Sequence, residues 1–456
     1  MAEGQVQSDS KVQTVSFFGF STPKVEPKVE PATKPQTAAK SGAKSDESTL
    51  AAQPFVASPG VAQIAQVEVE RGETVRSRAR PEYDPLGAYI GSFLLFPRLI
   101  ISESFTDNLF SANTGERADL ISRFAPEMSL NSDWGRHELG FEGGAEIGVH
   151  YDNPDENYQD YFFGTSGRLD VLAESSLSAA IDWENTHEGR GSPEDVGGTS
   201  PTEVDTINGS IEAFHPFGRF NATLSGAVRR TDFDDVLGAA GNINNDDRDR
   251  YRVVGSARLG YVIQPEYEAF VLGSYNVVNY DAAVDDAGLN RDSDGFDIVA
   301  GAAIDFTGLI FGDFFVGYQR QEFDDGRLQT VDGVSAGADI TWNVTPLTTI
   351  NGSLVREVRE TTTIGASGRE VITLGLTVDH ELLRNLILSA SGEAETDDFS
   401  GVGRNDKNFR AGFSANYRIN RNFFVGAGYN YRRRDSDAAG ADFQENIVFL
   451  SLGAQY

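Results

Sequence analysis

The final residues of the chain alternate between apolar side chains and small or polar ones. In steps of two from the end, one row is apolar and closes on an aromatic residue: Tyr456, Ala454, Leu452, Leu450 and Val448. The row between them is small or polar: Gln455, Gly453 and Ser451. A period of two places the two rows on opposite faces of a β-strand. The segment therefore predicts a strand whose faces meet two different environments.

The same alternation recurs along the chain, in runs longer than the strands of soluble sheets. Clear examples are residues 137–151, 251–261, 409–417 and 423–431, and the polar rows of the first three carry charges. A strand in a soluble sheet usually has about 5–6 residues, whereas a strand that crosses a membrane needs about 9–11. We count about 18 such strands between residues 99 and 456, an even number, as in bacterial single-chain barrels.

The connections between these strands are alternately short and long. Short ones contain turn residues, as at Gln264-Pro265-Glu266, and the long ones are acidic, as at residues 184–202, 232–249 and 281–294. Outer-membrane barrels have short periplasmic turns and longer extracellular loops. We therefore predict an all-β fold, a transmembrane antiparallel up-and-down β-barrel of about 18 strands. An even strand number places the N-terminal tail, the short turns and Tyr456 together on the periplasmic side.

The composition changes near residue 80. Residues 21–31 repeat Pro, Lys and Glu, a composition that cannot bury a core. We predict a disordered periplasmic tail at residues 1–80, a segment at residues 81–98 that leads into the barrel, and the barrel itself at residues 99–456. Residues 1–5 lack the charged and apolar regions of a signal peptide. Export would therefore require that the signal was removed, or that the start was assigned downstream.

The charge of the chain excludes several classes of protein. Residues 81–456 carry 60 acids against 28 bases, a formal charge of about −32, which is the wrong sign for a nucleic-acid-binding protein. The chain has no Cys, and its five His show no paired spacing. Neither a disulfide framework nor a zinc site is expected, and we predict no cofactor.

Several short stretches resemble the family called putative β-barrel porin 2, outer-membrane proteins of Gram-negative bacteria. The similar stretches, in chain order, are Arg80-Pro81-Glu82-Tyr83-Asp84-Pro85, Gly91-Ser92-Phe93, Asp107-Asn108-Leu109-Phe110, Gly191-Ser192-Pro193-Glu194-Asp195, Pro201-Thr202-Glu203, and Asp379-His380-Glu381-Leu382-Leu383-Arg384-Asn385-Leu386. The resemblance covers about residues 80–456. It implies an outer-membrane barrel, and some members of the family are associated with exopolysaccharide export. It supplies no catalytic residues.

The polar rows of the predicted strands identify candidate residues that line the lumen. These carry both signs of charge: Glu138, Glu142, Glu146, Arg252, Arg258, Glu393, Arg410, Arg418 and Arg432. Two interpretations remain open. The charges could form a transverse field that orders water and orients polar solutes, or they could pair across the interior and merely fill it. A barrel of about 16–18 strands leaves an aqueous channel unless something plugs it.

Other residues are predicted to meet the membrane. Val448, Leu450, Leu452, Ala454 and Tyr456 should face lipid on a strand that closes the barrel and that the assembly machinery reads. Trp134, Trp183 and Trp342 should anchor the barrel at the interfaces, because indole prefers the headgroup boundary. The loop carboxylates Asp246, Asp247 and Asp249 could bind divalent cations loosely and bridge lipopolysaccharide phosphates, although a solvated loop is the simpler interpretation.

One motif looks catalytic but lies in the wrong context. Gly333-Val334-Ser335-Ala336-Gly337 matches G-x-S-x-G, yet a nucleophile elbow requires a strand-to-helix turn and Ser335 lies inside an alternating run. We therefore expect no enzyme.

The function expected from the sequence is an outer-membrane porin, a passive, water-filled channel for small hydrophilic solutes with a mild preference for cations. The alternatives are an exopolysaccharide export conduit that works with a periplasmic and inner-membrane assembly, and a non-conducting structural barrel. Expected partners are outer-membrane lipids and lipopolysaccharide, the outer-membrane assembly machinery, and periplasmic export or cell-wall components that residues 1–80 could contact.

Overall fold

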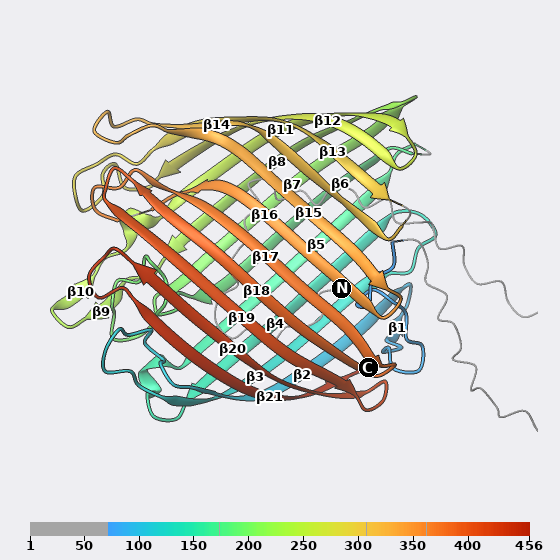
Figure 1. The fold of residues 1–456 in the computed structure, drawn as a ribbon, viewed down its shortest axis with the longest axis horizontal. Helices are drawn as coiled ribbons and strands as arrows, with labels where there is room; N and C mark the ends of the chain where they lie inside the picture. The colour runs from blue at the N-terminus through green and yellow to red at the C-terminus, as the bar shows by residue number, and fades with distance from the viewer. Residues whose placement is uncertain (1–71, 173, 307, 362) are drawn as a thin grey trace, which may run out of the picture. The chain divides into compact units, whose positions relative to one another are not determined.

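The computed structural model describes residues 72–172, 174–306, 308–361 and 363–456, which all belong to one compact unit. The predictions made for residues 1–71 lie outside this part of the chain. A single sheet of 19 strands dominates the described residues, and its neighbouring strands are antiparallel (Figure 1). Eighteen of these strands close into a barrel. The predicted fold class and strand number are confirmed.

The barrel strands follow one another around the ring in chain order. They are β2 (Phe93–Thr106), β3 (Asp119–Ser132), β4 (Glu138–His150), β5 (Tyr158–Asp170), β6 (Ser176–His187), β7 (Glu203–Phe217), β8 (Phe220–Phe233), β11 (Arg250–Gln264), β12 (Tyr267–Tyr280), β13 (Ser293–Phe306), β14 (Ile310–Phe323), β15 (Val331–Thr345), β16 (Thr348–Arg359), β17 (Gly368–Leu383), β18 (Leu386–Ser400), β19 (Arg404–Arg418), β20 (Phe423–Ser436) and β21 (Phe443–Gln455).

Smaller elements lie between these strands. The strand β1 (Ala88–Ile90) pairs with β2, and β9 (Val236–Gly238) with β10 (Gly241–Ile243) forms a hairpin in the connection after β8. There are two single-turn 3₁₀ helices in the described ranges: η1 (Pro154–Glu156) lies between β4 and β5, and η2 (Asp246–Arg248) follows β10 in the same connection as the hairpin. None of the helices in the described ranges is long and apolar enough to cross a membrane.

The first and last strands pair with each other and close the ring. β21 pairs with β20 from Phe423↔Ala454 onwards and with β2 from Arg98↔Gln455 to Thr106↔Ile447. The last strand therefore closes the barrel by joining β20 to β2. Closure matters because a barrel without free edges satisfies every ladder hydrogen bond inside a bilayer.

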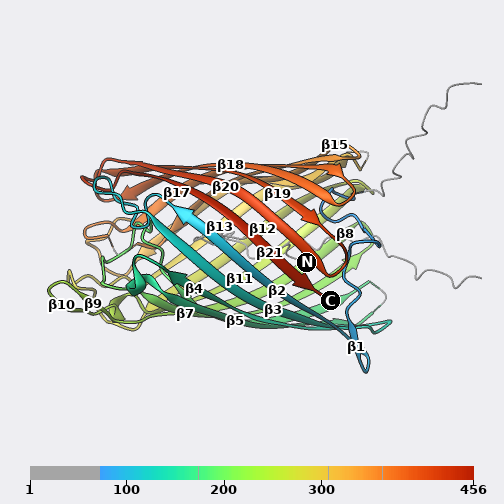
Figure 2. The same cartoon turned by 90° about the horizontal axis from the view of Figure 1, so that it is seen from below.

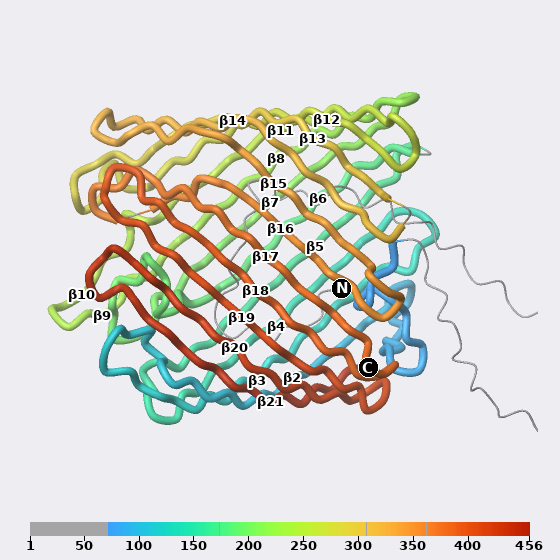
Figure 3. Tube along the Cα trace, in the orientation of Figure 1, coloured from blue at the N-terminus to red at the C-terminus, as the bar shows by residue number. Residues whose placement is uncertain are grey.

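The two ends of the barrel differ in their connections. Turns such as those between β7 and β8 or between β15 and β16 are tight, and they gather at the end where the chain also reaches Tyr456 (Figures 1 and 3). The longer connections, including the β9–β10 hairpin, lie at the opposite end. We call these the short-turn end and the long-loop end. β1 projects beyond the ring of strands at the short-turn end (Figure 2).

Each strand separates an apolar outer face from a polar inner face. On β21 the side chains of Val448, Leu450 and Leu452 are 50–61% exposed, whereas Ser451 is only 4% exposed. Exposed apolar residues follow the same period on the other strands, for example Ile207 and Ile211 on β7. This arrangement is that of a lipid-facing apolar band around a polar interior.

The boundary that the sequence suggested at residue 80 needs a correction. Residues 73–84, which we call the N-terminal segment, pack inside the short-turn end, with Val75 1% and Arg80 0% exposed. The first barrel strand, β2, then begins at Phe93, within the segment that was expected to lead into the barrel at residue 99. The prediction was wrong for residues 73–80 because the low hydrophobicity of the tail hides a short, arginine-rich stretch that binds acidic residues of the wall.

Candidate functional site

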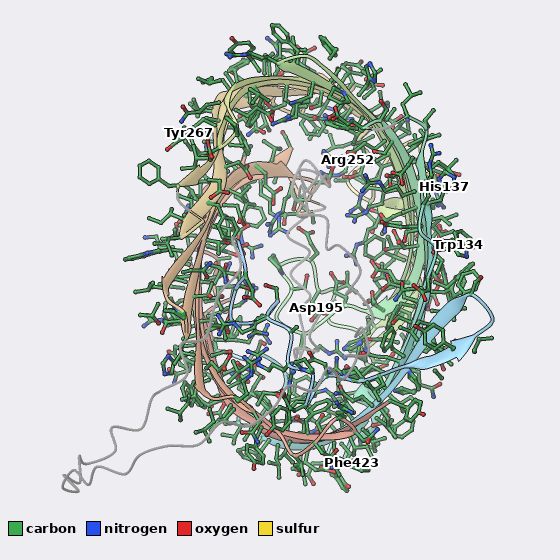
Figure 4. All side chains as sticks on the ribbon, turned by 90° about the vertical axis from the view of Figure 1, so that its right-hand side faces the viewer. Trp134, His137, Asp195, Arg252, Tyr267 and Phe423 are labelled. Atoms are coloured by element: carbon green, nitrogen blue, oxygen red, sulfur yellow. The ribbon has the colours of Figure 1, made fainter. Side chains whose placement is uncertain are left out.

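The lumen is the candidate functional site, and its wall carries both signs of charge. Figure 4 looks along the barrel, and the labelled Arg252 and Asp195 lie inside the ring of strands. A cavity of about 480 Å³ lies against the inner faces of the strands between β15 and β21, lined mainly by Ser, Asn, Gly and Arg residues. The interior is therefore polar and is not filled by side chains on this side.

Each of the five lumen arginines predicted from the sequence has a carboxylate partner. The pairs are Arg252–Glu360 at 2.7 Å, Arg258–Glu268 at 2.6 Å, Arg418–Asp84 at 2.7 Å, Arg432–Glu445 at 3.0 Å, and Arg410–Glu393. These pairs neutralise the five arginines, mostly between neighbouring strands of the wall, and both interpretations of the lumen charges remain open.

The glutamates of β4 are less evenly paired. Glu146 lies 3.5 Å from Arg123 and accepts a hydrogen bond from Tyr158, and Glu138 lies opposite Arg168 in register. Glu142 and Asp182 approach each other over Gly164, where a Cβ would lie 3.1 Å from Glu142 Oε1 and 3.4 Å from Asp182 Oδ1. Within the described ranges, neither of these two carboxylates has a hydrogen bond or an ion pair.

The N-terminal segment lines the wall at the short-turn end. Arg76 donates to Asp379 and Ser389 at 2.9 Å, and Arg80 donates to Glu381 at 2.8 Å. Arg78 also lies 3.3 Å from Glu381, whose side chain is 3% exposed. Two guanidinium groups therefore share one buried carboxylate, and Arg76 binds the carboxylate two residues away on the same face of β17.

Further contacts carry this segment along the rim from β15 to β19. Asn343 on β15 donates to the carbonyl oxygen of Glu73, and the backbone amide of Val75 donates to Thr349 on β16. At the other end, Arg421 donates to the carbonyl oxygen of Pro81, and Arg418 holds Asp84. Because the segment follows the wall from β15 to β19, its described residues narrow the mouth rather than cross it.

The connection between β6 and β7 folds into the lumen at the opposite end. We call residues 188–202 the inner loop. Its Arg190 is 7% exposed and holds Glu156 of η1 with two hydrogen bonds of 2.6 and 2.9 Å. Asp195, also on this loop, lies 3.5 Å from the Arg190 guanidinium and stands well inside the ring in Figure 4.

Contacts from distant parts of the ring hold the inner loop in place. Arg248 in η2 binds Glu188 with two hydrogen bonds of 3.0 and 3.1 Å. Thr361, after β16, donates to Glu194 at 2.7 Å, and Arg434 on β20 donates to the carbonyl oxygen of Gly191. A loop that starts at β6 and reaches both β16 and β20 crosses the barrel interior and constricts it.

Part of the long acidic loop predicted at residues 184–202 is thus not solvated. Glu184 belongs to β6, and the acids of residues 188–195 are engaged by Arg190, Arg248 and Thr361 in the interior. An acidic connection has the same composition whether its carboxylates meet water or meet arginines from remote strands, so the sequence alone does not distinguish the two cases.

The family described as Putative beta-barrel porin 2 matches residues 80–456. The chain belongs to this family. The match covers the whole barrel, so the family assignment and the closed fold support a location in the outer membrane. Two stretches through which the sequence resembles this porin family now have structural roles: Gly191–Asp195 lies in the inner loop, and Asp379 with Glu381 binds the N-terminal segment.

Solved structures that match the chain include three from Pseudomonas aeruginosa. OpdL is 13% identical with a TM-score of 0.40, and covers 80% of this chain and 99% of its own. OpdO is 14% identical with a TM-score of 0.43, and covers 80% and 97%. The siderophore receptor PirA is 7% identical with a TM-score of 0.41, and covers 79% and 80%. No curated protein matches the chain.

In this porin, the inner loop carries a carboxyl group, that of Asp195, whose pKa differs from its usual value. Burial raises the pKa of Asp195 above its usual range, and the nearby Glu188 and Glu156 raise it further, although Arg190 and the Gly197 amide oppose them. Because the pKa of Asp195 is raised when the inner loop lies inside the lumen, protonation of Asp195 stabilises the inward position of the loop. The stabilisation by protonation is fully present below the usual aspartate pKa of about 3.9, and it is lost as the pH rises through the raised pKa.

We therefore expect acidification to favour the constricted channel. Single-channel conductance at constant ionic strength should fall as the pH is lowered through the raised Asp195 pKa, over the range in which Glu156 and Glu188 stay ionised and keep their ion pairs with Arg190 and Arg248. The variant Asp195→Asn should resemble the acidic state at neutral pH and should show a weaker pH dependence. An unchanged pH profile in this variant would contradict the role of Asp195.

The remaining predicted membrane-facing residues lie on the outer surface. Trp134 and Trp342 are 42% and 45% exposed near the short-turn end, and Trp183 is 41% exposed on β6, where its indole donates to Asp205 at 3.1 Å. Tyr456 is 56% exposed, and its backbone amide donates to Pro97 at 3.1 Å. Interfacial anchoring and recognition by the assembly machinery remain predictions.

The structure also shows what surrounds the G-x-S-x-G serine and the loop carboxylates. Ser335 lies within β15 and donates to Asp297 at 2.7 Å, in a strand rather than a nucleophile elbow. Asp249 lies with Asp232 and Asp281 in a cluster whose ligand atoms are within 4.8 Å of one another. Arg230 binds Asp232 and Asp281, so this cluster already has a cation. Asp246 and Asp247 belong to η2.

Proposed function

We propose that the protein is a passive outer-membrane channel for small hydrophilic solutes. The observation that carries the proposal is a closed barrel of 18 strands whose polar lumen is narrowed by the inner loop but retains a cavity of about 480 Å³. Barrels of about 16–18 strands are wide enough to hold a water-filled pore. Solutes would diffuse through this water, and the inner loop would set the upper limit of their size.

The proposed orientation follows from the two kinds of connection. Short turns lie in the periplasm in outer-membrane barrels, and longer loops face the outside. The short-turn end, with the N-terminal segment and Tyr456, would then face the periplasm. Solutes arriving from outside would meet the inner loop first and the N-terminal segment last.

A mild cation preference follows from how the lumen charges are paired. The five lumen arginines described above are neutralised by carboxylates, whereas Glu142 and Asp182 have no ion-pair partner among the described residues. Unneutralised carboxylates on the wall raise the local concentration of cations. The negative charge of the chain outside residues 1–80 acts in the same direction.

Export of a long polymer is the weaker alternative. A polysaccharide strand would have to displace the inner loop, which is fixed by the Arg190–Glu156, Arg248–Glu188 and Arg434–Gly191 contacts. Breaking one partner of a buried ion pair costs about 3–5 kcal/mol. Loss of surface polymer on deletion of the protein would favour the export hypothesis over the small-solute channel.

Planar-bilayer recordings of the purified protein test the proposal. We expect stable conductance with a reversal potential that indicates mild cation selectivity. Clear anion selectivity would contradict the assignment of Glu142 and Asp182, and an absence of conductance would favour a structural barrel. The variant Glu142→Gln/Asp182→Asn should lose the cation preference, and Glu322→Gln, on an exposed outer pair with Arg320, is the matched control.

The same recordings should compare the full chain with two truncations. Removal of residues 1–71 tests whether that part of the chain obstructs the pore. Removal of residues 1–84 also deletes the segment that lines the short-turn mouth, so it should give a larger conductance than the first truncation.

A further inference from the structure

Two arginines stand side by side in the middle of the lumen wall. Arg410 on β19 and Arg432 on β20 are directly opposite each other in register. Their carboxylate partners, Glu393 and Glu445, lie on the far sides, so the row across four strands reads Glu393, Arg410, Arg432, Glu445. Like charges directly opposite each other on neighbouring strands destabilise a sheet. A bound anion between the two arginines would offset this repulsion.

The known partners leave guanidinium donors unused. A guanidinium group has five N–H donors, and Arg410 binds Glu393 through one nitrogen, as Arg432 binds Glu445. The Nε atom of Arg432 is buried without a hydrogen-bond partner in the described part of the chain. The side chains of Arg410 and Arg432 are 28% and 15% exposed, so both remain accessible from the lumen.

The surroundings of the pair form a hollow with further polar groups. Both arginines line the cavity of about 480 Å³, together with Ser391, Asn430 and Arg76 of the N-terminal segment. The absence of a side chain at Gly412, two residues from Arg410, lets polar groups approach the wall closely, because a Cβ would lie 2.8 Å from Ser391 Oγ and 2.9 Å from Asn430 Oδ1. The Ser391 hydroxyl can donate beside the two guanidinium groups, and hydroxyl and guanidinium donors together are suited to an oxyanion.

The pair also lies directly beneath the constriction. A Cβ on Gly191 of the inner loop would lie 2.7 Å from a terminal nitrogen of Arg432. A solute that passes the inner loop therefore meets Arg432 and Arg410 next. An anion held between the two guanidinium groups would accept charge-assisted hydrogen bonds and relieve their mutual repulsion.

We propose that Arg410 and Arg432 form a binding site for small oxyanionic solutes, carrying a carboxylate or a phosphate group, inside the lumen. The proposal rests on the channel function proposed above and names a class of solute that would pause within it. It is compatible with a mild cation preference, because a site that binds an anion delays its passage, while the acidic wall of β4 and β6 still attracts cations.

Current interruptions in planar bilayers test the site. Succinate and inorganic phosphate serve as the two probes, and a neutral sugar of similar size is the control solute. We expect one or both anions to interrupt the current in a concentration-dependent manner, and the sugar to have no such effect. The probe that binds more tightly distinguishes carboxylate from phosphate as the preferred group.

Variants separate the site from a general effect of charge. Arg410→Gln or Arg432→Gln should weaken binding about tenfold or more, as expected for loss of a charge-assisted hydrogen bond, and the double variant should abolish it. Arg433→Gln is the matched control, because Arg433 neighbours Arg432 on β20 but is 57% exposed and pairs with Asp435. Glu393→Gln removes a competing carboxylate and should strengthen binding.

The outcomes distinguish this proposal from the channel function. Conductance without interruptions by either anion, or interruptions unchanged in the Arg410→Gln/Arg432→Gln variant, would overturn the site while leaving the channel intact. If the protein does not conduct, calorimetric titration of the detergent-solubilised protein with the same two probes decides. Heat of binding that the double variant lacks would support the site, and no heat with either probe would overturn it.

Discussion

Replacement of Arg190 by glutamine is expected to raise the single-channel conductance severalfold. Arg190 is the buried partner of both Glu156 and Asp195, with side chains 7%, 4% and 17% exposed. Removal of the guanidinium group leaves one buried carboxylate, Glu156, and one half-buried carboxylate, Asp195, without their closest cation. Removing one partner of a buried ion pair costs about 3–5 kcal/mol, which shifts the equilibrium between the inward and released loop by more than two powers of ten. The inner loop should therefore leave the lumen.

An exposed arginine provides the control for this substitution. Arg327 is 62% exposed and pairs with Asp325 in another long-loop connection. An exposed pair contributes about 0–1 kcal/mol, so Arg327→Gln should leave the conductance unchanged. Glu156→Gln removes the other half of the Arg190 pair and should also raise the conductance.

The position of the loop can be checked separately from the current. Hydrogen exchange of residues 188–202 should become faster in Arg190→Gln if the loop is released. Faster exchange with unchanged conductance would mean that the inner loop does not limit the pore, and the size limit proposed for the channel would then be wrong.

The barrel itself was predictable because its signal is local. The alternation of Val448, Leu450 and Leu452 with smaller residues specifies which face meets lipid, since a slip by one residue would turn every side chain to the other face. Short turns and long connections then order the strands in chain sequence. Each of these inferences needs only neighbouring residues, and each agrees with the observed register of β21 against β20 and β2.

The contents of the lumen were not predictable in the same way. Arg434 and Gly191 are 243 residues apart in the chain, and no local pattern around either residue indicates the other. For the same reason, the sequence did not show which lumen charges form ion pairs with each other. An acidic composition is shared by solvated loops and by a loop whose carboxylates contact arginines in the interior.

One missed signal was present in the sequence. Arg76, Arg78 and Arg80 recur with a period of two, and Asp379 and Glu381 have the same period on β17. Two complementary charged rows of equal spacing suggest that the segments bind each other, with the arginines facing one wall. The Pro, Lys and Glu repeat further upstream concealed this pattern by extending the predicted tail to residue 80.

Deletion of Tyr456 is expected to reduce assembly of the barrel while leaving the conductance of correctly folded molecules unchanged. Tyr456 ends the strand that closes the ring, and its amide donates to Pro97 at 3.1 Å. Loss of this residue shortens the seam between β21 and β2 and removes an exposed aromatic from the membrane boundary. Assembly can be measured on gels after a pulse of synthesis, as the fraction of the protein that migrates as a folded, heat-modifiable barrel.

Two substitutions on β21 separate the seam from the lipid-facing band. Tyr456→Phe keeps the aromatic ring and the backbone hydrogen bond, so it should assemble like the unaltered protein. Leu450→Arg places a charge on a side chain that is 61% exposed on the outer face, which costs about 2–4 kcal/mol near the bilayer midplane. It should therefore lower folded yield and resistance to urea together. Normal assembly of both Leu450→Arg and the Tyr456 deletion would contradict the lipid-facing role of this row, because neither the apolar band nor the closing seam could then limit insertion.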